Sequence, residues 1–307
     1  MQIYLPIADL PVNIFLMLGM GLAVGIISGM FGIGGGFLMT PLLIFIGIPS
    51  GVAVASVASH IAASSCSGAL SYWRRNAVDM ALVGMLLVGG IIGTAAGVVL
   101  FTVLRSVGQL DIVIGLSYVA LLGIVGGLMI NESLRVILRE RSGQSTPTRR
   151  GGSHTWIHGL PLKMRFKRSR IYVSAIPVVA IGFVIGFIGA IMGIGGGFML
   201  VPMLIYLLRV PTTTVIGTSM VLTLVTMASA TIMHAVTNQL VDAVLALILM
   251  VGGVIGAQFG ARAGQNMRGE RLRLLLGVLV FAVGLRFAYQ LVVVPADLFS
   301  LLVLDVE

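Results

Sequence analysis

Charged residues are scarce in this sequence. Asp, Glu, Lys and Arg make up 9% of the 307 residues, whereas hydrophobic residues make up 58%. A water-soluble domain carries roughly 25% charged residues, and the mean hydropathy of +1.11 agrees with the shortage of charge. The chain is therefore expected to be an integral membrane protein. Its long apolar runs favour helices over an outer-membrane barrel, whose strands would alternate with a period of two.

Cysteine and central carboxylates are also scarce. Cys66 is the one cysteine, which excludes an intramolecular disulfide and a thiolate metal cluster. Because Cys66 lies among small residues in an apolar run, we expect a buried structural thiol. Asp79 and Asp242 fall at the ends of apolar runs, so a central cation site lacks the carboxylates it would need. No metal and no cofactor is expected.

The basic residues, which give a net charge of +9, gather between the apolar runs. Such loops are typical of the cytoplasmic side of a membrane protein, so no nucleic-acid partner is expected. The longest basic stretch, 135–170, is interpreted as a cytoplasmic linker between a first transmembrane repeat, 1–134, and a second, 171–307. Attachment of this stretch to the membrane surface is the alternative.

One motif occurs twice. Gly32-Ile33-Gly34-Gly35-Gly36-Phe37 is repeated as Gly193-Ile194-Gly195-Gly196-Gly197-Phe198, and each copy has a proline four residues later. The two copies lie 161 residues apart, and other features recur at offsets of 162 or 163, namely Pro49/Pro211, Ser56/Thr218, Asn76/Asn238, Asp79/Asp242 and Gly93/Gly256. Matched features at a nearly constant offset indicate an internal duplication. Three adjacent glycines cost about 1 kcal/mol each inside a helix, so the motif predicts a turn.

The fold class expected is an all-α polytopic membrane protein with 8–10 apolar segments. Each half would comprise a glycine-tipped helical hairpin and three transmembrane helices. The distribution of basic loops requires the two halves to be inverted, as in many secondary transporters. The apolar segments after the glycine blocks, 38–48 and 199–208, span about half a bilayer, which places both turns near the midplane.

Glycines spaced four apart form three further rows: Gly21, Gly25 and Gly29; Gly89, Gly93 and Gly97; and Gly252, Gly256 and Gly260. This spacing puts the glycines of each row on one face of a helix, where a second helix can approach closely. We interpret these rows as packing surfaces and not as ligand sites.

The chemistry predicted at the centre is anion binding. Residues after each glycine turn begin a helix, whose first N–H groups and dipole favour negative charge. Polar stripes on the runs 51–72 and 212–235, the second including Thr223, add neutral hydroxyl groups. The candidate substrate-binding residues are Gly34, Gly35, Gly36, Phe37, Ser56, Ser59, His60, Gly195, Gly196, Gly197, Phe198, Thr218 and Ser219.

Three residues are also candidates for proton coupling or gating: His60, Asp79 and Asp242. Each prediction has a structural alternative. The glycine turns could serve packing alone, the hydroxyls could bond their own helix, and the two aspartates could cap helices. His60, and His234 near the end of a span, could be packing residues.

The repeated glycine motif, Gly217-Thr218-Ser219 and the Gly252-Gly253-x-x-Gly256 row make this chain resemble the TauE/SafE sulfite exporter family. The resemblance covers nearly the whole chain apart from 135–170 and the termini. It implies movement of sulfite, sulfoacetate and related organosulfonates across the cytoplasmic (inner) membrane, mainly outward. The first half reads Ala55-Ser56-Val57 where the second has Gly-Thr-Ser, so the two halves of the site are not identical.

The expected function is secondary transport of a small sulfur-containing oxyanion by alternating access around the midplane site. A passive anion channel and a non-transporting scaffold or accessory subunit stay as alternatives. No enzymatic activity is expected, because Gly217-Thr218-Ser219-Met220 lacks the Gly-x-Ser-Gly pattern of an intramembrane protease. The expected partners are the anion and the lipid bilayer, and a homodimer stays open.

Overall fold

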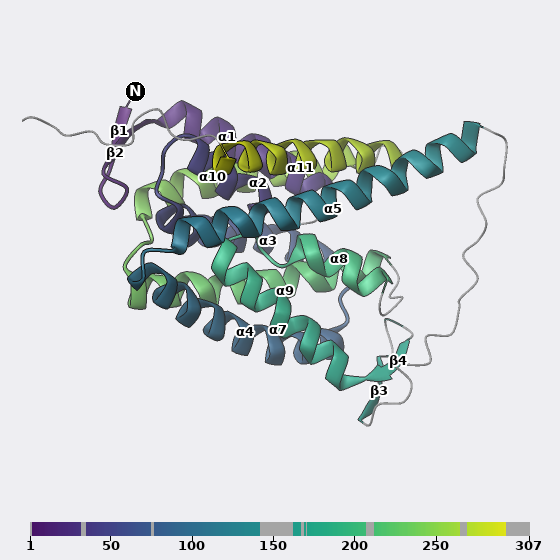
Figure 1. Cartoon of the computed structure of the whole chain (residues 1–307). Coiled ribbons are helices and arrows are strands. Elements are labelled where there is room, and N and C mark those ends of the chain that lie inside the picture. Colours follow the sequence, from purple (N-terminus) through teal and green to yellow (C-terminus); the bar gives the residue numbers. More distant parts are fainter. Residues whose placement is uncertain are drawn as a thin grey trace, which may run out of the picture. The chain divides into compact units, whose positions relative to one another are not determined.

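The computed structural model describes residues 2–31, 35–74, 77–141, 162–166, 169, 171–206, 212–264 and 269–292. Within these ranges the chain is almost entirely helical (Figure 1). By length and composition, seven of the described helices can cross a membrane. The predicted class, an all-α polytopic membrane protein, is confirmed.

The helices follow the same order in both halves. The first half contains α1 (Ile14–Phe31), α2 (Gly36–Phe45), α3 (Ser50–Arg74), α4 (Met80–Ser106) and α5 (Leu110–Arg141). The second half contains α7 (Ala175–Met192), α8 (Gly197–Tyr206), α9 (Thr212–Met233), the π-helical turn η1 (His234–Asn238), α10 (Ala243–Gly264) and α11 (Gly269–Val292). Each half thus has the predicted pair of helices around a glycine block, followed by three longer helices.

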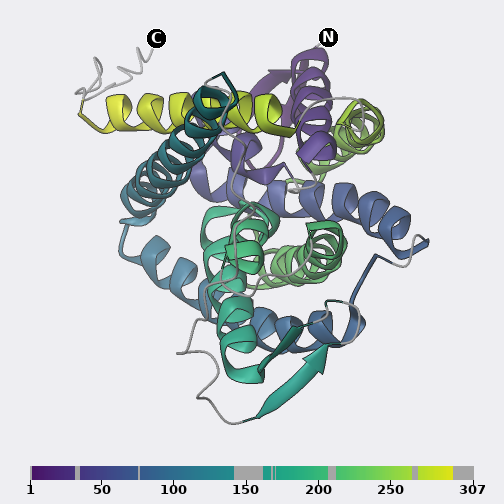
Figure 2. The ribbon, with the colours of Figure 1, turned by 90° about the vertical axis from the view of Figure 1, so that its right-hand side faces the viewer.

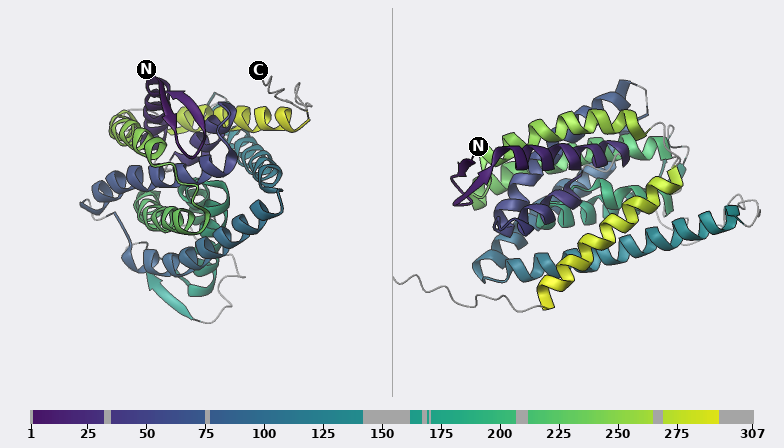
Figure 3. Two further views of the ribbon diagram at one scale, coloured as in Figure 1. Left: turned by 90° about the vertical axis from the view of Figure 1, so that its left-hand side faces the viewer. Right: turned by 90° about the horizontal axis from the view of Figure 1, so that it is seen from above.

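A β-hairpin precedes the first helix of each half, which the sequence analysis did not predict. Strand β1 (Gln2–Leu5) pairs with β2 (Leu10–Asn13), and β3 (Lys163–Phe166) pairs with β4 (Ile171–Ser174). The duplication therefore extends to the hairpins. Each hairpin lies at the N-terminal end of the helix that it precedes, and the two hairpins lie at opposite ends of the packed helices, with β3–β4 in front in Figure 2 and β1–β2 in front in the left view of Figure 3.

The stretch 135–170 contains regular structure at both ends. Helix α5 continues through Arg141, and β3 begins at Lys163, while residues 142–161 lie outside the described ranges. The chain divides into two compact units, one formed by 1–111 with 147–267 and the other by 112–146 with 268–307. These compact units do not correspond to the two predicted repeats, 1–134 and 171–307, and the division into repeats stays a prediction.

The second unit is held by its own contacts between α5 and α11. The rings of Tyr118 and Phe287 stack with centroids 5.1 Å apart. A Cβ added to Gly126 would lie 2.9 Å from the backbone nitrogen of Phe281, so the two helices touch at the backbone there.

In the first unit, α1 lies along α10 and α4 lies along α7 (Figure 3, right, for the first pair). The glycine rows form both contacts. A Cβ added to Gly25 would lie 2.9 Å from the Cα of Gly253, and one added to Gly97 would lie 2.6 Å from the carbonyl oxygen of Phe187. Backbones that approach so closely gain van der Waals contact without side-chain obstruction. The predicted packing role of the rows is confirmed.

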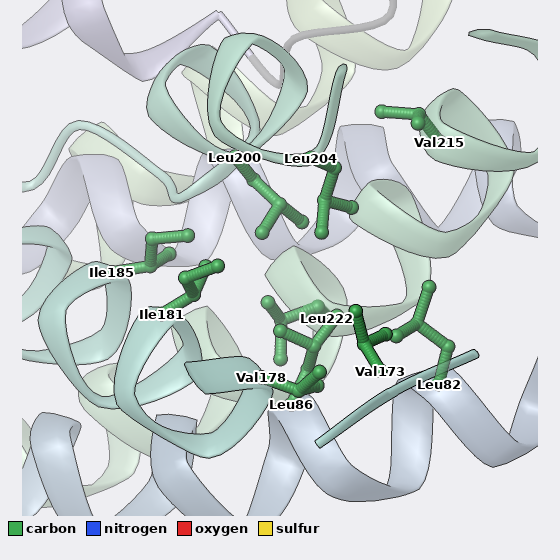
Figure 4. Close-up of a cluster of buried hydrophobic side chains, with 10 residues drawn as sticks. All are labelled: Leu82, Leu86, Val173, Val178, Ile181, Ile185, Leu200, Leu204, Val215 and Leu222. Atoms are coloured by element: carbon green, nitrogen blue, oxygen red, sulfur yellow. The ribbon is translucent and has the colours of Figure 1, made fainter. Parts of the chain in front are cut away.

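A hydrophobic cluster fills the space between α4, β4, α7, α8 and α9 (Figure 4). Its buried members are Leu82, Leu86, Val173, Val178, Ile181, Ile185, Leu200, Leu204, Val215 and Leu222. Because β4 contributes Val173, the second hairpin is packed onto the helices by side chains as well as by the hydrogen bonds described below.

The expected burial of Cys66 is wrong: its side chain is exposed on α3. Ser64 and Ser65 are buried instead. Neighbouring positions on a helix point about 100° apart, so the small residues around Cys66 in the sequence do not determine on which face it lies.

Candidate functional site

The two glycine blocks meet in the first unit. Gly35 and Gly195 have φ values of +68° and +72°, a left-handed conformation that suits glycine. Helices α2 and α8 begin just after them, at Gly36 and Gly197. A Cβ added to Gly36 would lie 2.6 Å from the carbonyl oxygen of Ile194. The predicted turns and helix starts are thus present and touch one another; Gly34 lies outside the described residues.

Phe37 and Phe198 lie at the starts of α2 and α8 and pack against each other. Their rings stack with centroids 4.6 Å apart and planes inclined by 12°, and both side chains are buried. The hydroxyl of Thr40 on α2 also donates to the carbonyl oxygen of Gly193, at 3.2 Å. The starts of α2 and α8 are therefore held together by aromatic stacking and a hydrogen bond.

Helices α3 and α9 supply two residues that cover the turns. A Cβ added to Gly195 would lie 2.8 Å from Cγ2 of Ile61 and 3.4 Å from Cγ2 of Thr223. Ile61 also covers Gly36, and the Thr223 hydroxyl would lie 3.9 Å from a Cβ on Gly196. Since an offset of 162 relates Ile61 to Thr223, the duplicated helices place an apolar residue and a hydroxyl at matched positions.

Thr223 Oγ1 is buried and has no hydrogen-bond partner among the described residues. A buried hydroxyl normally has a partner, because leaving it unpaired costs about 1–3 kcal/mol. Thr223 lies in the predicted polar stripe but was not among the candidate site residues, and Ile61 was not predicted at all. The offset of 162 between Ile61 and Thr223 is the sequence feature that could have identified both as site residues.

His60 is buried on α3, and its ring packs against Gly253 on α10. Nδ1 lies 2.8 Å from the carbonyl oxygen of Leu249, so this nitrogen carries a proton and donates it. Nε2 is buried without a partner among the described residues. The counterpart of His60 in the second half is Leu222, whose side chain packs against Gly90 on α4. The imidazole therefore breaks the symmetry of the two halves.

The surroundings of His234 differ from those of His60. Its Nε2 donates to the carbonyl oxygen of Ala190 at 3.1 Å, and its Nδ1 accepts from the amide of Asn238 at 3.2 Å. The ring also makes an edge contact with Phe101. Both nitrogens have partners, which agrees with the packing alternative for this histidine.

The other predicted hydroxyls are engaged within the protein. Ser59 donates to the carbonyl oxygen of Ser56 at 2.6 Å, and Ser219 donates to that of Ile216 at 2.9 Å. Ser56 and Thr218 accept hydrogen bonds from the backbone N–H groups of Asp242 and Asp79, at 3.0 and 3.4 Å. Contact of these four residues with a substrate stays a prediction.

Asp79 and Asp242 are buried and cap α4 and α10. Oδ1 of Asp79 accepts from the N–H of Leu82 at 3.3 Å, and Oδ1 of Asp242 accepts from that of Leu245 at 3.0 Å. The structural alternative, helix capping, is therefore present. Since the same aspartates also bond Thr218 and Ser56, each helix start is tied to the opposite half of the chain.

The second oxygen of each aspartate accepts from the hairpin of the opposite half. Oδ2 of Asp79 accepts from the N–H and the hydroxyl of Ser169, at 2.9 and 2.8 Å. Oδ2 of Asp242 accepts from the N–H of Ile7 at 3.0 Å. Sequence reasoning missed these contacts because the hairpin residues lie far from the aspartates along the chain.

The start of α8 carries groups of the kind that favour negative charge. The first intrahelical bond of α8 runs from Leu200 N–H to the carbonyl oxygen of Gly196, so the N–H groups of Gly197, Phe198 and Met199 precede it. Such groups, the helix dipole and a free hydroxyl together favour negative charge. A helix of ten residues provides this dipole.

Comparisons with known proteins agree with this architecture. The family Sulfite exporter TauE/SafE matches residues 17–287. A "Probable membrane transporter protein" of Xylella fastidiosa (strain 9a5c) is 28% identical over 283 residues, which cover 89% of this chain and 94% of that protein.

Two proteins of Bacillus subtilis (strain 168) are similar as well. "Probable membrane transporter protein YjnA" is 28% identical over 87% of this chain and 96% of its own length. "Probable membrane transporter protein YunE" is 24% identical over 88% and 96%, respectively. No solved structure matches the chain significantly. With glycine-tipped, duplicated helices and a family match over nearly its whole length, this multi-pass membrane protein belongs to the TauE/SafE sulfite exporter family.

Proposed function

We propose that this protein is a secondary transporter that exports small sulfur-containing oxyanions, such as sulfite or organosulfonates, across the cytoplasmic membrane. The observation that carries the proposal is the unpartnered Thr223 hydroxyl beside the glycine turn that begins α8. A bare backbone turn, a helix start and a buried hydroxyl without a partner among the described residues together favour negative charge, and none of these groups is a cationic side chain. Such groups can hold an anion loosely enough to release it.

Alternating access is supported by the duplication. Helices α1 and α10 pack together, as do their counterparts α7 and α4. Two matched sets of helices can rock about the contact between the glycine turns and expose it to one side at a time. The basic residues at the C-terminal end of α3 and within 135–170 favour a cytoplasmic position for Asp79 and the β3–β4 hairpin. The β1–β2 hairpin and Asp242 would then face outward.

The test is binding and flux of the purified protein in liposomes. Sulfite, thiosulfate, sulfoacetate and a carboxylate control are presented to wild type, Thr223→Val and Thr223→Ser. Loss of one hydrogen bond to a charged ligand costs about 1.5–3 kcal/mol, so Thr223→Val should weaken binding by about ten- to a hundredfold. Thr223→Ser keeps the hydroxyl and should behave like wild type.

Thr226→Val is the matched control. Thr226 is equally buried on the same helix, but its hydroxyl already donates to the carbonyl oxygen of Leu222 at 2.9 Å. This variant should keep normal flux. Equal losses in Thr223→Val and Thr226→Val, or none in either, would argue against an anion at this turn.

Two alternatives have distinct outcomes in the same liposomes. A passive channel would carry the anion but never accumulate it against its gradient, even with a proton gradient imposed. A scaffold or accessory subunit would neither bind nor carry any of the anions, although the protein would still be folded.

A further inference from the structure

Two matched contacts tie the halves of the first unit together. We define the Asp79 latch as Asp79 with Ser169 and Thr218, and the Asp242 latch as Asp242 with Ile7 and Ser56. In each latch, a carboxylate accepts a backbone N–H from the hairpin of the other half, and the aspartate N–H donates to a hydroxyl of the other half. Offsets of 162 and 163 relate the two hydroxyls and the two aspartates.

The latches lie at opposite ends of the unit. The β1–β2 hairpin and the β3–β4 hairpin occupy opposite ends in Figure 1. Near the Asp242 latch, a Cβ added to Gly51 would lie 3.0 Å from Leu240. Near the Asp79 latch, one added to Gly217 would lie 2.6 Å from the carbonyl oxygen of Ala77. Each latch therefore joins the first turns of one helix, α3 or α9, to the residues just before α10 or α4 of the other half.

The bonding of the carboxylates allows a latch to open without unfolding a helix. Oδ1 of each aspartate caps its own helix, whereas Oδ2 bonds the hairpin. Release of the hairpin exposes Oδ2 to water, which can replace the lost donor. The cap and its interaction with the helix dipole are unaffected. A contact between halves that can break independently of the helices is what a gate requires.

We infer that the two latches are the gates of the transport cycle, with Asp79, Ser169, Asp242 and Ile7 as gate residues. This inference rests on the alternating-access part of the proposed function. The Asp79 latch releases when the cavity opens at its end of the helices, and the Asp242 latch releases when the other end opens. In the structure both latches are closed.

The experiment measures the accessibility of one buried cysteine near each latch. Cys66→Ser removes the native thiol, and Ala53→Cys or Val215→Cys then serves as a reporter. Both positions are fully buried and are related by the offset of 162. Ala53 lies one turn before Ser56, and Val215 lies one turn before Thr218. Labelling by a membrane-impermeant maleimide is followed in the full-length protein in liposomes, without substrate.

The latches are broken one at a time. Asp242→Asn keeps an oxygen for the helix cap but allows an NH2 group to face the N–H of Ile7. Asp79→Asn is combined with Ser169→Ala, because the serine hydroxyl could otherwise accept from the new amide. Asp9→Asn is the control, since Asp9 accepts from Tyr4 within its own hairpin. Asn also tolerates the positive φ of 53° at this position.

Each broken latch should expose its own reporter. Asp242→Asn should speed the labelling of Ala53→Cys by about tenfold and leave Val215→Cys unchanged, because one lost hydrogen bond to a charged group shifts an opening equilibrium by roughly that factor. The Asp79 and Ser169 double variant should do the reverse, and Asp9→Asn should change neither rate. Equal acceleration of both reporters, or no acceleration, would overturn the inference.

The experiment distinguishes failure of the gates from failure of the proposed substrate. If wild type carried no sulfur oxyanion but the reporters responded one end at a time, the gates would stand and the proposed substrate would fail. If sulfite flux were normal and both reporters responded together, the gates alone would fail.

Discussion

The rings of Phe37 and Phe198 stack at 4.6 Å, and an offset of 161 relates the two residues. Each is the second residue of the helix that follows a glycine turn. The stack therefore joins the equivalent points of the two halves. It also keeps two helix starts, both of positive potential, side by side.

Replacement of the stacked rings tests their coupling. Phe37→Leu and Phe198→Leu should each lower the free energy of unfolding. The double variant should lose less stability than the sum of the two single losses. A coupling free energy of about 0.5–1.5 kcal/mol is expected for a stacked pair. Unfolding by a denaturing detergent measures it. The control combines Phe37→Leu with Phe183→Leu, whose rings do not stack on each other, and the two losses of stability should add. A coupling free energy of similar size in this control would show that the stack does not couple Phe37 to Phe198 specifically.

Added volume at the contact between the turns should abolish transport. In Gly36→Ala the new methyl group would lie 2.6 and 2.7 Å from the carbonyl oxygens of Ile194 and Gly193, and backbone cannot yield as a side-chain end can. We expect flux below a tenth of the wild-type rate while the protein still inserts into the membrane. Gly84→Ala is the control, since its Cβ would meet nothing within 4 Å. Normal flux in Gly36→Ala would contradict a functional contact between the turns.

His60→Leu tests the predicted proton-coupling role of the imidazole. Leucine occupies the matched position, Leu222, and packs against Gly90 as His60 packs against Gly253. The variant should therefore fold and still allow downhill flux. Because it lacks the buried Nε2, a proton gradient should no longer accelerate transport. If liposomes with an imposed pH difference respond like wild type, His60 is not the proton carrier.

Ile61 should limit the size of the transported anion. Its side chain covers both Gly36 and Gly195, so Ile61→Ala opens space above both turns at a cost of about 2–5 kcal/mol in stability. We expect larger sulfonates to compete with sulfite for uptake in this variant but not in wild type. Ile61→Val removes one methylene and should cost about 0.5–1.5 kcal/mol with little change in selectivity. Competition assays in liposomes distinguish the two.

The apolar runs allowed much of the helical framework to be predicted, and the duplicated glycine motif allowed the two turns to be predicted. Helix α1 covers the same residues as the apolar run 14–31, and Asn13 directly before it accepts from the N–H of Phe15. The starts of α4 at Met80 and α5 at Leu110 also agree with the apolar runs. The end of α5 does not, because a helix can leave the apolar region and continue through polar residues to Arg141.

The hairpins and the latches could not be predicted in this way. Strands of four residues that include Pro11, or follow a basic stretch, resemble loops in a single sequence. The partner of Asp242 is a backbone N–H at Ile7, a group that no side-chain pattern reveals. Similarly, His60 and His234 are equally isolated in the sequence. Only the structure gives His234 two partners and leaves Nε2 of His60 with none among the described residues.

The packing of α1 along α10 has a consequence for the synthesis of the protein. Helix α1 ends at Phe31, whereas α10 begins at Ala243, so the ribosome adds more than two hundred residues between them. At about 5–20 residues per second, α1 has been synthesised for on the order of ten to forty seconds before its partner exists. During that interval the row of Gly21, Gly25 and Gly29 faces lipid or the insertion machinery. Helices of the first half thus remain without their partners until the second half is translated, whereas helices of the second half meet partners that already exist.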